Sequence, residues 1–258
     1  MDKVVLIGAG NVATHLGKAL KSFYHIAQVY SRTMESASAL ASKLGCEAVT
    51  DLSKVVTDAD YYFCAVKDDV LPQLLPELCK GREKAIFVHT SGSLPMDVFK
   101  GYARRYGVFY PLQTFSKNRD VYFEDVPCFL EASDKETETD LWFFMFGITE
   151  KMTLMSSADR KYLHLSAVFA CNFVNHCYDL AYKLLEQHGI PFINLIPLID
   201  ETTKKVLYDM SPREAQTGPA VRYDENIISM QSQMLEGRMK EIYDLMSKSI
   251  HERSMEQS

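Results

Sequence analysis

The sequence predicts an α/β domain with a doubly wound parallel sheet, followed by an all-helical domain. In the first half, short β-branched and apolar runs alternate with segments of helical periodicity, which is the pattern of βαβ units. After about residue 155 the helical periodicity continues and no strand pattern appears. We therefore expect a sheet domain over residues 1–154 and a helical domain over residues 155–258.

Seven segments of the first half have the length and composition of buried strands. They are Lys3–Ile7, Ile26–Tyr30, Glu47–Val49, Tyr61–Ala65, Ala85–His89, Gly107–Tyr110 and Val126–Leu130. The last contains Pro127, which cannot donate to a strand ladder, so we expect it at the edge of the sheet. Helical patterns lie between the strands at Val12–Phe23, Met34–Leu44, Val70–Leu78 and Glu136–Phe146, with a kink or an end expected at Pro76.

Long helical patterns make up the second half. Ala158–Gln187 contains neither glycine nor proline and predicts one continuous helix, whose mostly apolar centre is typical of a buried helix. Ile193–Tyr208 and Asn226–Ile250 predict two more helices with a loop around Ser211–Pro219 between them. The final residues, 254–258, are expected to fray.

The composition disfavours several classes of protein. Hydrophobic residues make up 47% of the 258 residues, as in an ordinary globular chain. A net charge of −6 disfavours nucleic acid and anionic membranes as partners, because both attract positive surfaces. No apolar run approaches the ~20 residues that span a bilayer. The six cysteines form no Cys-x-x-Cys pair and the histidines show no ligand spacing, so we expect a cytoplasmic protein with free thiols and no metal.

A glycine-rich turn joins the first strand to the first helix. Residues 8–13 read Gly-Ala-Gly-Asn-Val-Ala, the G-x-G-x-x-A pattern of Rossmann-like dinucleotide-binding domains. Gly8 permits the tight turn, Gly10 allows a diphosphate to approach the backbone, and Ala13 lets helix and strand pack closely. The helix N-terminus offers free N–H groups to the anion. The expected cofactor-binding residues of this turn are Gly8, Gly10, Asn11, Val12 and Ala13.

The end of the second strand indicates which dinucleotide is bound. An NAD-selective site has Asp or Glu here to bind the ribose 2′-hydroxyl, whereas this chain has Ser31 and Arg32. A hydroxyl and a guanidinium suit a 2′-phosphate through charge-assisted hydrogen bonds. The alternative is that Arg32 is an ordinary solvated side chain. We predict NADP as the cofactor.

Two further strand ends lead to the same crevice, since ligands of such sheets bind at the carboxyl ends of parallel strands. Val66 follows the fourth strand, and the segment from His89 to Ser93 follows the fifth. We expect Val66, His89, Ser91 and Gly92 to contact the cofactor. The alternative for the second segment is an ordinary turn capped by Ser91 or Ser93.

A polar stripe interrupts the apolar helix of the second half. Lys161, His164, Asn172 and Asn175 fall within an arc of roughly 80° on a regular α-helix. Buried polar groups need partners or a wet cavity. Lys161 is the first candidate for the proton donor, because partial burial can lower its pKa toward the working pH, and His164, one turn away, is the alternative acid. Asn172 is expected to orient a substrate carbonyl or carboxylate. The other interpretation is a set of satisfied polar residues between the two domains.

Six segments match, in order, the motifs of one family of NADP-dependent oxidoreductases. They are Gly8–Ala13, Ser31-Arg32, residues 89–93 (HTSGS), residues 111–115 (PLQTF), Lys161-x-x-His164 and residues 217–224 (TGPAVRYD). Over nearly its whole length the chain resembles this family, which pairs a Rossmann-like domain with a helical C-terminal domain of unknown function. The family is similar in fold to pyrroline-5-carboxylate reductase and to the 6-phosphogluconate and β-hydroxyacid dehydrogenases.

The resemblance implies roles for residues of both halves. Lys161 and His164 would face the nicotinamide, with Asn172 nearby. The candidate substrate-binding residues are Gln113, Asn175 and Arg222. Arg222 would bind a substrate carboxylate or form an internal salt bridge with Asp224.

The chain departs from the family at Tyr110, where many members have histidine. A tyrosine donates a hydrogen bond but does not shuttle protons near neutral pH. This departure bears on any acid–base chemistry that the position performs in other members.

These observations predict an NADP(H)-dependent reductase that transfers hydride to a small keto acid or cyclic imine in the cleft between its domains. The alternative is a sensor or scaffold protein that binds NADP without catalysis. Apolar C-terminal helices such as Leu165–Tyr178 have more surface to bury than one short domain can cover, so we also expect a homodimer through them.

Overall fold

The computed structural model describes residues 1–256, which form two compact units. The first unit runs from Met1 to Cys171, and the second begins at Asn172. The boundary between the two compact units therefore falls after residue 171, later than the domain boundary expected after residue 154. The first helix beyond the sheet belongs to the sheet unit because it is anchored there by Arg160, whose side chain is buried.

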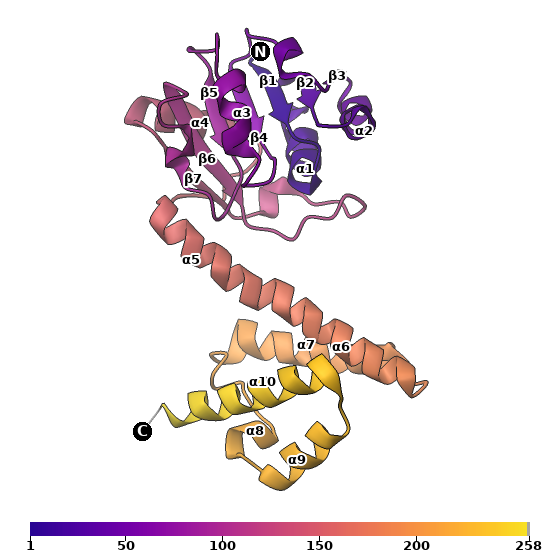
Figure 1. Cartoon of the computed structure of the whole chain (residues 1–258). Coiled ribbons are helices and arrows are strands. Elements are labelled where there is room, and N and C mark those ends of the chain that lie inside the picture. The colour runs from indigo at the N-terminus through magenta and orange to yellow at the C-terminus, as the bar shows by residue number, and fades with distance from the viewer. Residues whose placement is uncertain (257–258) are drawn as a thin grey trace. The chain divides into compact units, whose positions relative to one another are not determined.

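The first unit is built on an eight-stranded sheet with the order β3-β2-β1-β4-β5-β6-β7-β8 (Figure 1). The strands are β1 (Lys3–Ile7), β2 (His25–Tyr30), β3 (Glu47–Val49), β4 (Tyr61–Cys64), β5 (Ile86–His89), β6 (Arg105–Pro111), β7 (Cys128–Ala132) and β8 (Met152–Leu154). Neighbouring strands are parallel except β6 and β7, which are antiparallel. The predicted α/β fold class is thus confirmed.

The prediction that the seventh strand lies at the edge of the sheet is wrong. β7 pairs with β6 on one side and with β8 on the other. Pro127 immediately precedes β7, and its carbonyl accepts a hydrogen bond from the Leu112 N–H at 2.9 Å. The proline therefore costs the sheet no ladder bond. β8 escaped prediction because three residues carry too little alternation to identify a strand.

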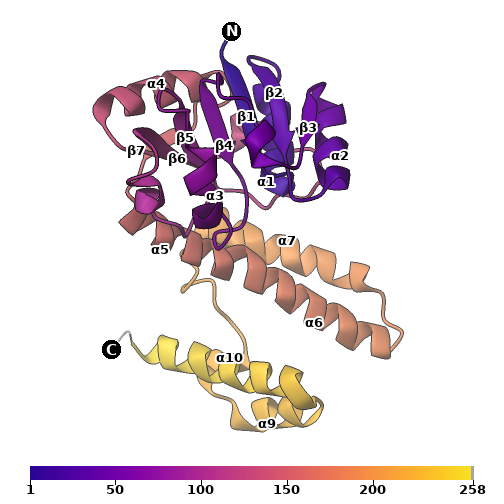
Figure 2. The same ribbon diagram turned by 45° about the horizontal axis from the view of Figure 1, so that its top comes forward.

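Helices cover both faces of the sheet, and successive side chains of a strand pack against helices on opposite faces. Val4 and Leu6 belong to a core with the helices α1 (Asn11–Leu20), α2 (Met34–Leu44) and α4 (Lys135–Phe146). Val5 and Ile7 belong to a second core with α3 (Leu71–Leu78), which Figures 1 and 2 both show on the near side of β4 and β5. Because both faces are covered, consecutive strand positions are buried and apolar, as in doubly wound folds; in β1 the four residues from Val4 to Ile7 are all buried.

Helix α3 continues through Pro76, where a kink or an end was expected. Its buried residues are Leu71, Leu75 and Leu78, which pack against the sheet. Burying three leucines contributes several kcal/mol, at about 1.5–3 kcal/mol each. This exceeds the roughly 3 kcal/mol that an internal proline costs a helix, so packing determines the structure here.

The helix predicted at Ala158–Gln187 consists of three segments. They are α5 (Ser157–Ala167), a π-helical segment η4 (Val168–Phe173) and α6 (Val174–Gln187). A π turn holds more residues than an α turn, so the offsets of a regular α-helix do not apply between His164 and Asn172. The predicted alignment of the polar stripe is therefore wrong. Within the single chain the apolar centre of this helix is not covered, since Leu165 is 53% exposed.

The remaining elements all lie in the second unit. They are η5 (Phe192–Leu195), α7 (Ile196–Lys204), η6 (Lys205–Asp209), α8 (Pro219–Arg222), α9 (Glu225–Gln233) and α10 (Gly237–Met255). Figures 1 and 2 show α7 beside α6, and the rings of Tyr182 and Phe192 lie 5.8 Å apart where α6 meets η5. The helix predicted at Asn226–Ile250 is interrupted before Gly237, whose φ of 54° lies outside the right-handed helical region.

Helix α10 ends at Met255, so the start of the tail expected to fray is helical. The last two residues of that tail, 257–258, lie outside the described residues. Over residues 1–256, no helix combines the length and the apolar character that crossing a membrane requires.

Candidate active site

The glycine-rich turn has the geometry that an anion-binding turn requires. Gly8 has a φ of 119°, and a Cβ at this position would lie 2.3 Å from the carbonyl oxygen of Ala65, which directly follows the neighbouring strand β4. A Cβ at Gly10 would meet no protein atom within 4 Å, so this glycine faces open space. Gly10 is also the N-cap of α1 and supplies no side chain to cap it. The first N–H groups of α1 are thus left for a ligand.

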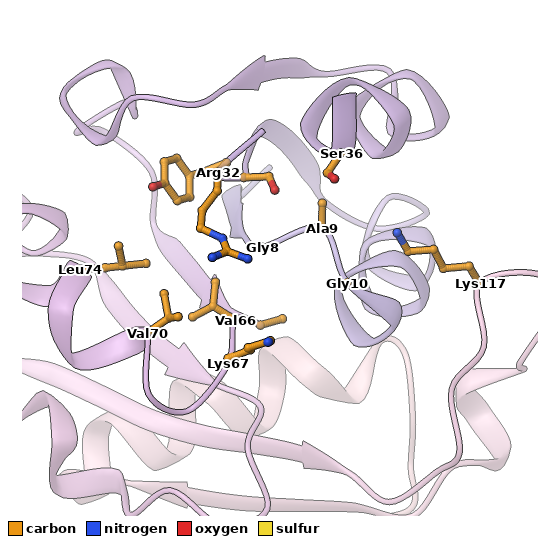
Figure 3. Close-up of a pocket in the computed structure, with 13 residues that line it drawn as sticks. Gly8, Ala9, Gly10, Arg32, Ser36, Val66, Lys67, Val70, Leu74 and Lys117 are labelled. Carbon is orange, nitrogen blue, oxygen red and sulfur yellow. The ribbon is translucent and has the colours of Figure 1, made fainter. Parts of the chain in front are cut away.

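Next to this turn lies a cavity of about 310 Å³, shown in Figure 3. Ser31, Arg32 and Ser36 line it from the end of β2 and the start of α2. Lys67 and Lys117 add two further cations, and none of the 13 lining residues is acidic. The cavity therefore offers positive charge and hydroxyl groups beside the turn, as a phosphorylated ribose requires.

A second cavity of about 410 Å³ continues from the first along the ends of the strands. The two cavities share Gly10, Ala65, Val66 and Lys67. The predicted site residues that line the second are Gly10, Asn11, Val12, Val66, Ser91, Gly92, Gln113 and His164. Together the two cavities form one crevice at the carboxyl ends of β1, β2, β4, β5 and β6, where doubly wound sheets bind ligands.

At the far end of this crevice, His164 of α5 is held between Tyr110 and Gly92. The Tyr110 Oη lies 2.9 Å from His164 Nδ1, and the two rings meet edge to face. A Cβ at Gly92 would lie 2.5 Å from the same Nδ1, so only glycine leaves room for the imidazole. Burial raises the pKa of Tyr110 above its usual 10, and its hydroxyl stays protonated at neutral pH. The position at which the chain departs from the family motif is thus in contact with a candidate proton donor.

His89 lies beneath the crevice rather than in its lining. Its side chain is 1% exposed, and its ring stacks on Phe99. Its Nδ1 accepts a hydrogen bond from the Ser91 N–H at 3.1 Å, and burial lowers its pKa to about 3. A neutral His89 therefore supports the turn that follows β5.

Ser91 both lines the second cavity and caps its own turn. Its Oγ accepts hydrogen bonds from the N–H groups of Ser93 and Leu94 at 3.1 and 3.0 Å, and donates to Asp68 at 2.9 Å. The turn-cap interpretation of this segment therefore describes the hydrogen bonds of Ser91 correctly. The same bonds fix the turn that carries Gly92 next to His164.

Sequence reasoning missed Arg160, which anchors α5 to the sheet. Its guanidinium is 1% exposed and bonds to Glu131 of β7 at 2.6 Å and to the Leu94 carbonyl at 2.8 Å. Glu131 also accepts hydrogen bonds from Ser157, at the start of α5. One buried ion pair therefore positions both α5, which carries His164, and the segment after β5. The isolated charges at residues 131 and 160 gave no signal in the sequence, because the fold alone brings them together.

Other predicted residues lie apart from the two cavities. Ala13 is buried in the core beneath the turn. Lys161 is exposed, with its Nζ 5.0 Å from the centre of the Tyr162 ring, and lacks the partial burial on which its predicted pKa depended. Asn172, Asn175 and Arg222 belong to the second unit and are exposed there. Asp224 caps α9 by accepting a hydrogen bond from the Ile227 N–H at 3.3 Å.

A doubly wound sheet, a glycine turn without a side-chain cap and the Arg32 cation after β2 define an NADP-binding oxidoreductase domain. Sequence comparison agrees, since residues 3–91 match the family described as NADP oxidoreductase, coenzyme F420-dependent. Residues 126–250 match a domain of unknown function, DUF2520. The chain is 48% identical to a protein of Bacteroides fragilis whose name describes it as a candidate NADP oxidoreductase. That likeness covers 98% of both chains with a TM-score of 0.93. The chain belongs to this family of NADP oxidoreductases.

More distant solved structures share the fold. An imine reductase of Myxococcus stipitatus in complex with NADP⁺ is 16% identical, with a TM-score of 0.69 and coverage of 98% of this chain and 93% of that one. The 1-pyrroline-5-carboxylate reductase of Streptococcus pyogenes is 13% identical, with a TM-score of 0.63 and coverage of 97% and 98%. No curated protein matches the sequence. The predicted family, enzyme class and cofactor are confirmed.

Proposed function

We propose that this NADP oxidoreductase reduces a small keto acid or a cyclic imine, with His164 as the proton donor. The observation that carries the proposal is the contact between His164 and Tyr110 at the end of the cofactor crevice, 2.9 Å between Nδ1 and Oη. The fold shared with an imine reductase and a pyrroline-5-carboxylate reductase supports the substrate class. Bound NADPH supplies hydride from C4 of its nicotinamide ring.

The residues of the chain would orient the substrate and deliver the proton. As general acid, His164 would act as the imidazolium: its Nδ1–H donates to the Tyr110 Oη, and its Nε2–H is offered to the oxygen or nitrogen next to the carbon that receives hydride. Proton transfer leaves a neutral imidazole whose Nδ1 keeps the contact with the Tyr110 hydroxyl. Gln113 and Ser91 line the same cavity and supply groups that bind a substrate carbonyl or carboxylate. We favour His164 over Lys161 because Lys161 is exposed and lines neither cavity.

The test measures NADPH oxidation on a panel of 2-keto acids and cyclic imines, with the variants His164→Asn, Tyr110→Phe and Lys161→Ala. We expect His164→Asn to lower kcat at least about 100-fold, as loss of a general acid does, with the Kd for NADPH changed less than about twofold. Tyr110→Phe should lower kcat by about tenfold, because one neutral hydrogen bond to the imidazole is lost. Lys161→Ala is the matched control on the same helix.

Two results would contradict the proposal. A loss of kcat in Lys161→Ala with retained activity in His164→Asn would assign the proton to the lysine. Turnover of neither substrate class by the wild type, under conditions where NADPH binds, would remove keto acids and imines as substrates.

We further infer that the enzyme is a homodimer of the cytoplasm. In the second unit Leu198 and Leu207 are 62% and 64% exposed, and large exposed apolar surfaces are typical of subunit interfaces. A second copy suits them, because closed two-fold dimers are the most frequent assemblies. All six cysteines are free, which supports a reducing compartment.

A further inference from the structure

Helix α1 presents a polar face to a loop that is distant in the sequence. Asn11, His15 and Lys18 stand at positions i, i+4 and i+7 of α1, on one side of the helix. All three contact residues 113–120, the segment between β6 and η3 (Phe123–Asp125), which we call the 113–120 loop. The N-terminus of α1 faces the cofactor crevice, and the side of the same helix holds the 113–120 loop in place.

The contacts fix the backbone of this loop near its middle. Asn11 Nδ2 donates to the Phe115 carbonyl at 2.8 Å, and His15 Nε2 donates to the Ser116 carbonyl at 2.9 Å. The donor assignment for His15 follows because a carbonyl oxygen only accepts. The His15 ring also stacks on Phe115, with centroids 5.2 Å apart, and is 3% exposed.

The residue that follows these anchored positions is Lys117, which lines the first cavity. Figure 3 shows its side chain extending toward the turn that carries Ala9 and Gly10, on the side opposite Arg32 and Val66. Lys117 and Arg32 therefore offer two cations to the cavity from elements on different sides of the glycine turn. NADP carries a diphosphate and a 2′-phosphate, and a site with cations on one side alone would leave part of that charge unpaired.

We propose that the 113–120 loop is part of the NADP site and that Lys117 binds a phosphate of the cofactor, with Asn11 and His15 as positioning residues. Asn11, expected from the motif to contact the cofactor, has its side-chain amide on the loop instead. The proposal depends on the cofactor of the family and not on the substrate class proposed above. A failure to reduce keto acids or imines would leave it intact.

The first experiment measures the Kd for NADPH by fluorescence titration at several salt concentrations. Lys117→Ala should raise the Kd by about tenfold, since a charge-assisted hydrogen bond to a phosphate is lost, and should weaken the dependence of the Kd on salt. Lys100→Ala is the matched control outside the cavity. Lys117 and Lys100 are both exposed, so neither substitution should disturb the fold. An unchanged Kd in Lys117→Ala, equal to that of Lys100→Ala, would overturn the proposal.

The second experiment tests whether α1 acts through Lys117. His15→Phe keeps the aromatic contact with Phe115 but removes the hydrogen bond to the Ser116 carbonyl. Its Kd for NADPH should rise about threefold in the wild-type background and hardly at all in Lys117→Ala, because coupled residues give non-additive effects. An equal rise in both backgrounds would show that His15 does not position Lys117.

Hydrogen exchange supplies a readout that needs neither turnover nor a variant. The amides of residues 115–118 should exchange more slowly when NADPH is bound, because the anchored loop then holds a ligand. Unchanged exchange in this loop, together with slowed exchange at residues 8–13, would confine the cofactor to the glycine turn and overturn the proposal.

Discussion

The buried side chain of His89 makes the stability of the folded chain depend on pH. Burial lowers the pKa of His89 to about 3, well below the ordinary value near 6.5. Between these two values the unfolded chain binds a proton that the folded chain does not, so stability falls as the pH drops through 6.5. At pH 5.5 the loss amounts to about 1.4 kcal/mol relative to pH 7.5.

Urea denaturation at the two pH values measures this effect. His89→Asn should be less stable at both, yet should lose about 1.4 kcal/mol less than the wild type on acidification. His25→Asn, at an exposed position of β2, should behave as the wild type does. Equal acid sensitivity of wild type and His89→Asn would show that other groups account for the pH dependence.

At the same scale, local motifs made part of the site predictable. Gly8 and Arg32 were identified because their function depends on a few neighbouring residues, and both line the crevice. Lys117 and the Tyr110–His164 contact could not be predicted, since each depends on segments that only the folded sheet brings together. His89 was assigned to the cofactor because its position in the sequence does not distinguish the lining of a cavity from the layer beneath it.

At the scale of elements, the contact between α5 and the turn after β5 determines where His164 lies. Gly92→Ala would place a methyl group 2.5 Å from the imidazole nitrogen, so the ring must move and lose its hydrogen bond to Tyr110. We expect kcat to fall about tenfold or more with a small change in the Kd for NADPH, measured by turnover and by titration. Gly101→Ala is not a suitable control because of its φ of 86°.

Ser93→Ala is the better comparison, because Ser93 lies in the same turn, lines the same cavity and is exposed. Its kcat should stay within about threefold of the wild type, since one exposed hydroxyl contributes little. A Gly92→Ala variant with full kcat would mean that the position of His164 does not limit the reaction.

Most elements of the sheet unit followed from periodicity, because strands buried on both faces and amphipathic helices leave clear patterns. α2 was predicted with its observed bounds, Met34–Leu44. The π-helical segment η4 was missed, since its hydrogen-bond register differs from that of an α-helix while its composition does not. That difference removed the basis of the predicted stripe linking His164 to Asn172.

For the whole molecule, the apolar surface of the second unit is the feature that a single chain leaves unexplained. Leu198 of α7 and Leu207 of η6 are both more than half exposed, although burying each is worth about 1.5–3 kcal/mol. A second copy that covers them would remove this apolar surface from water. We therefore expect a mass of twice 29.4 kDa in solution at tens of micromolar.

Multi-angle light scattering and sedimentation measure this mass directly. Leu198→Asp should raise the dimer dissociation constant more than about 100-fold, because it removes an apolar contact and would bury a charge. Phe143→Asp changes an apolar residue of α4 in the sheet unit that is exposed to 73%, against 62% for Leu198, and should leave the dimer intact. A wild-type mass of one chain, or a dimer that Phe143→Asp disrupts and Leu198→Asp does not, would place the interface elsewhere. The apolar composition of these helices predicted a need for burial, but one sequence alone does not distinguish burial within a chain from burial between two.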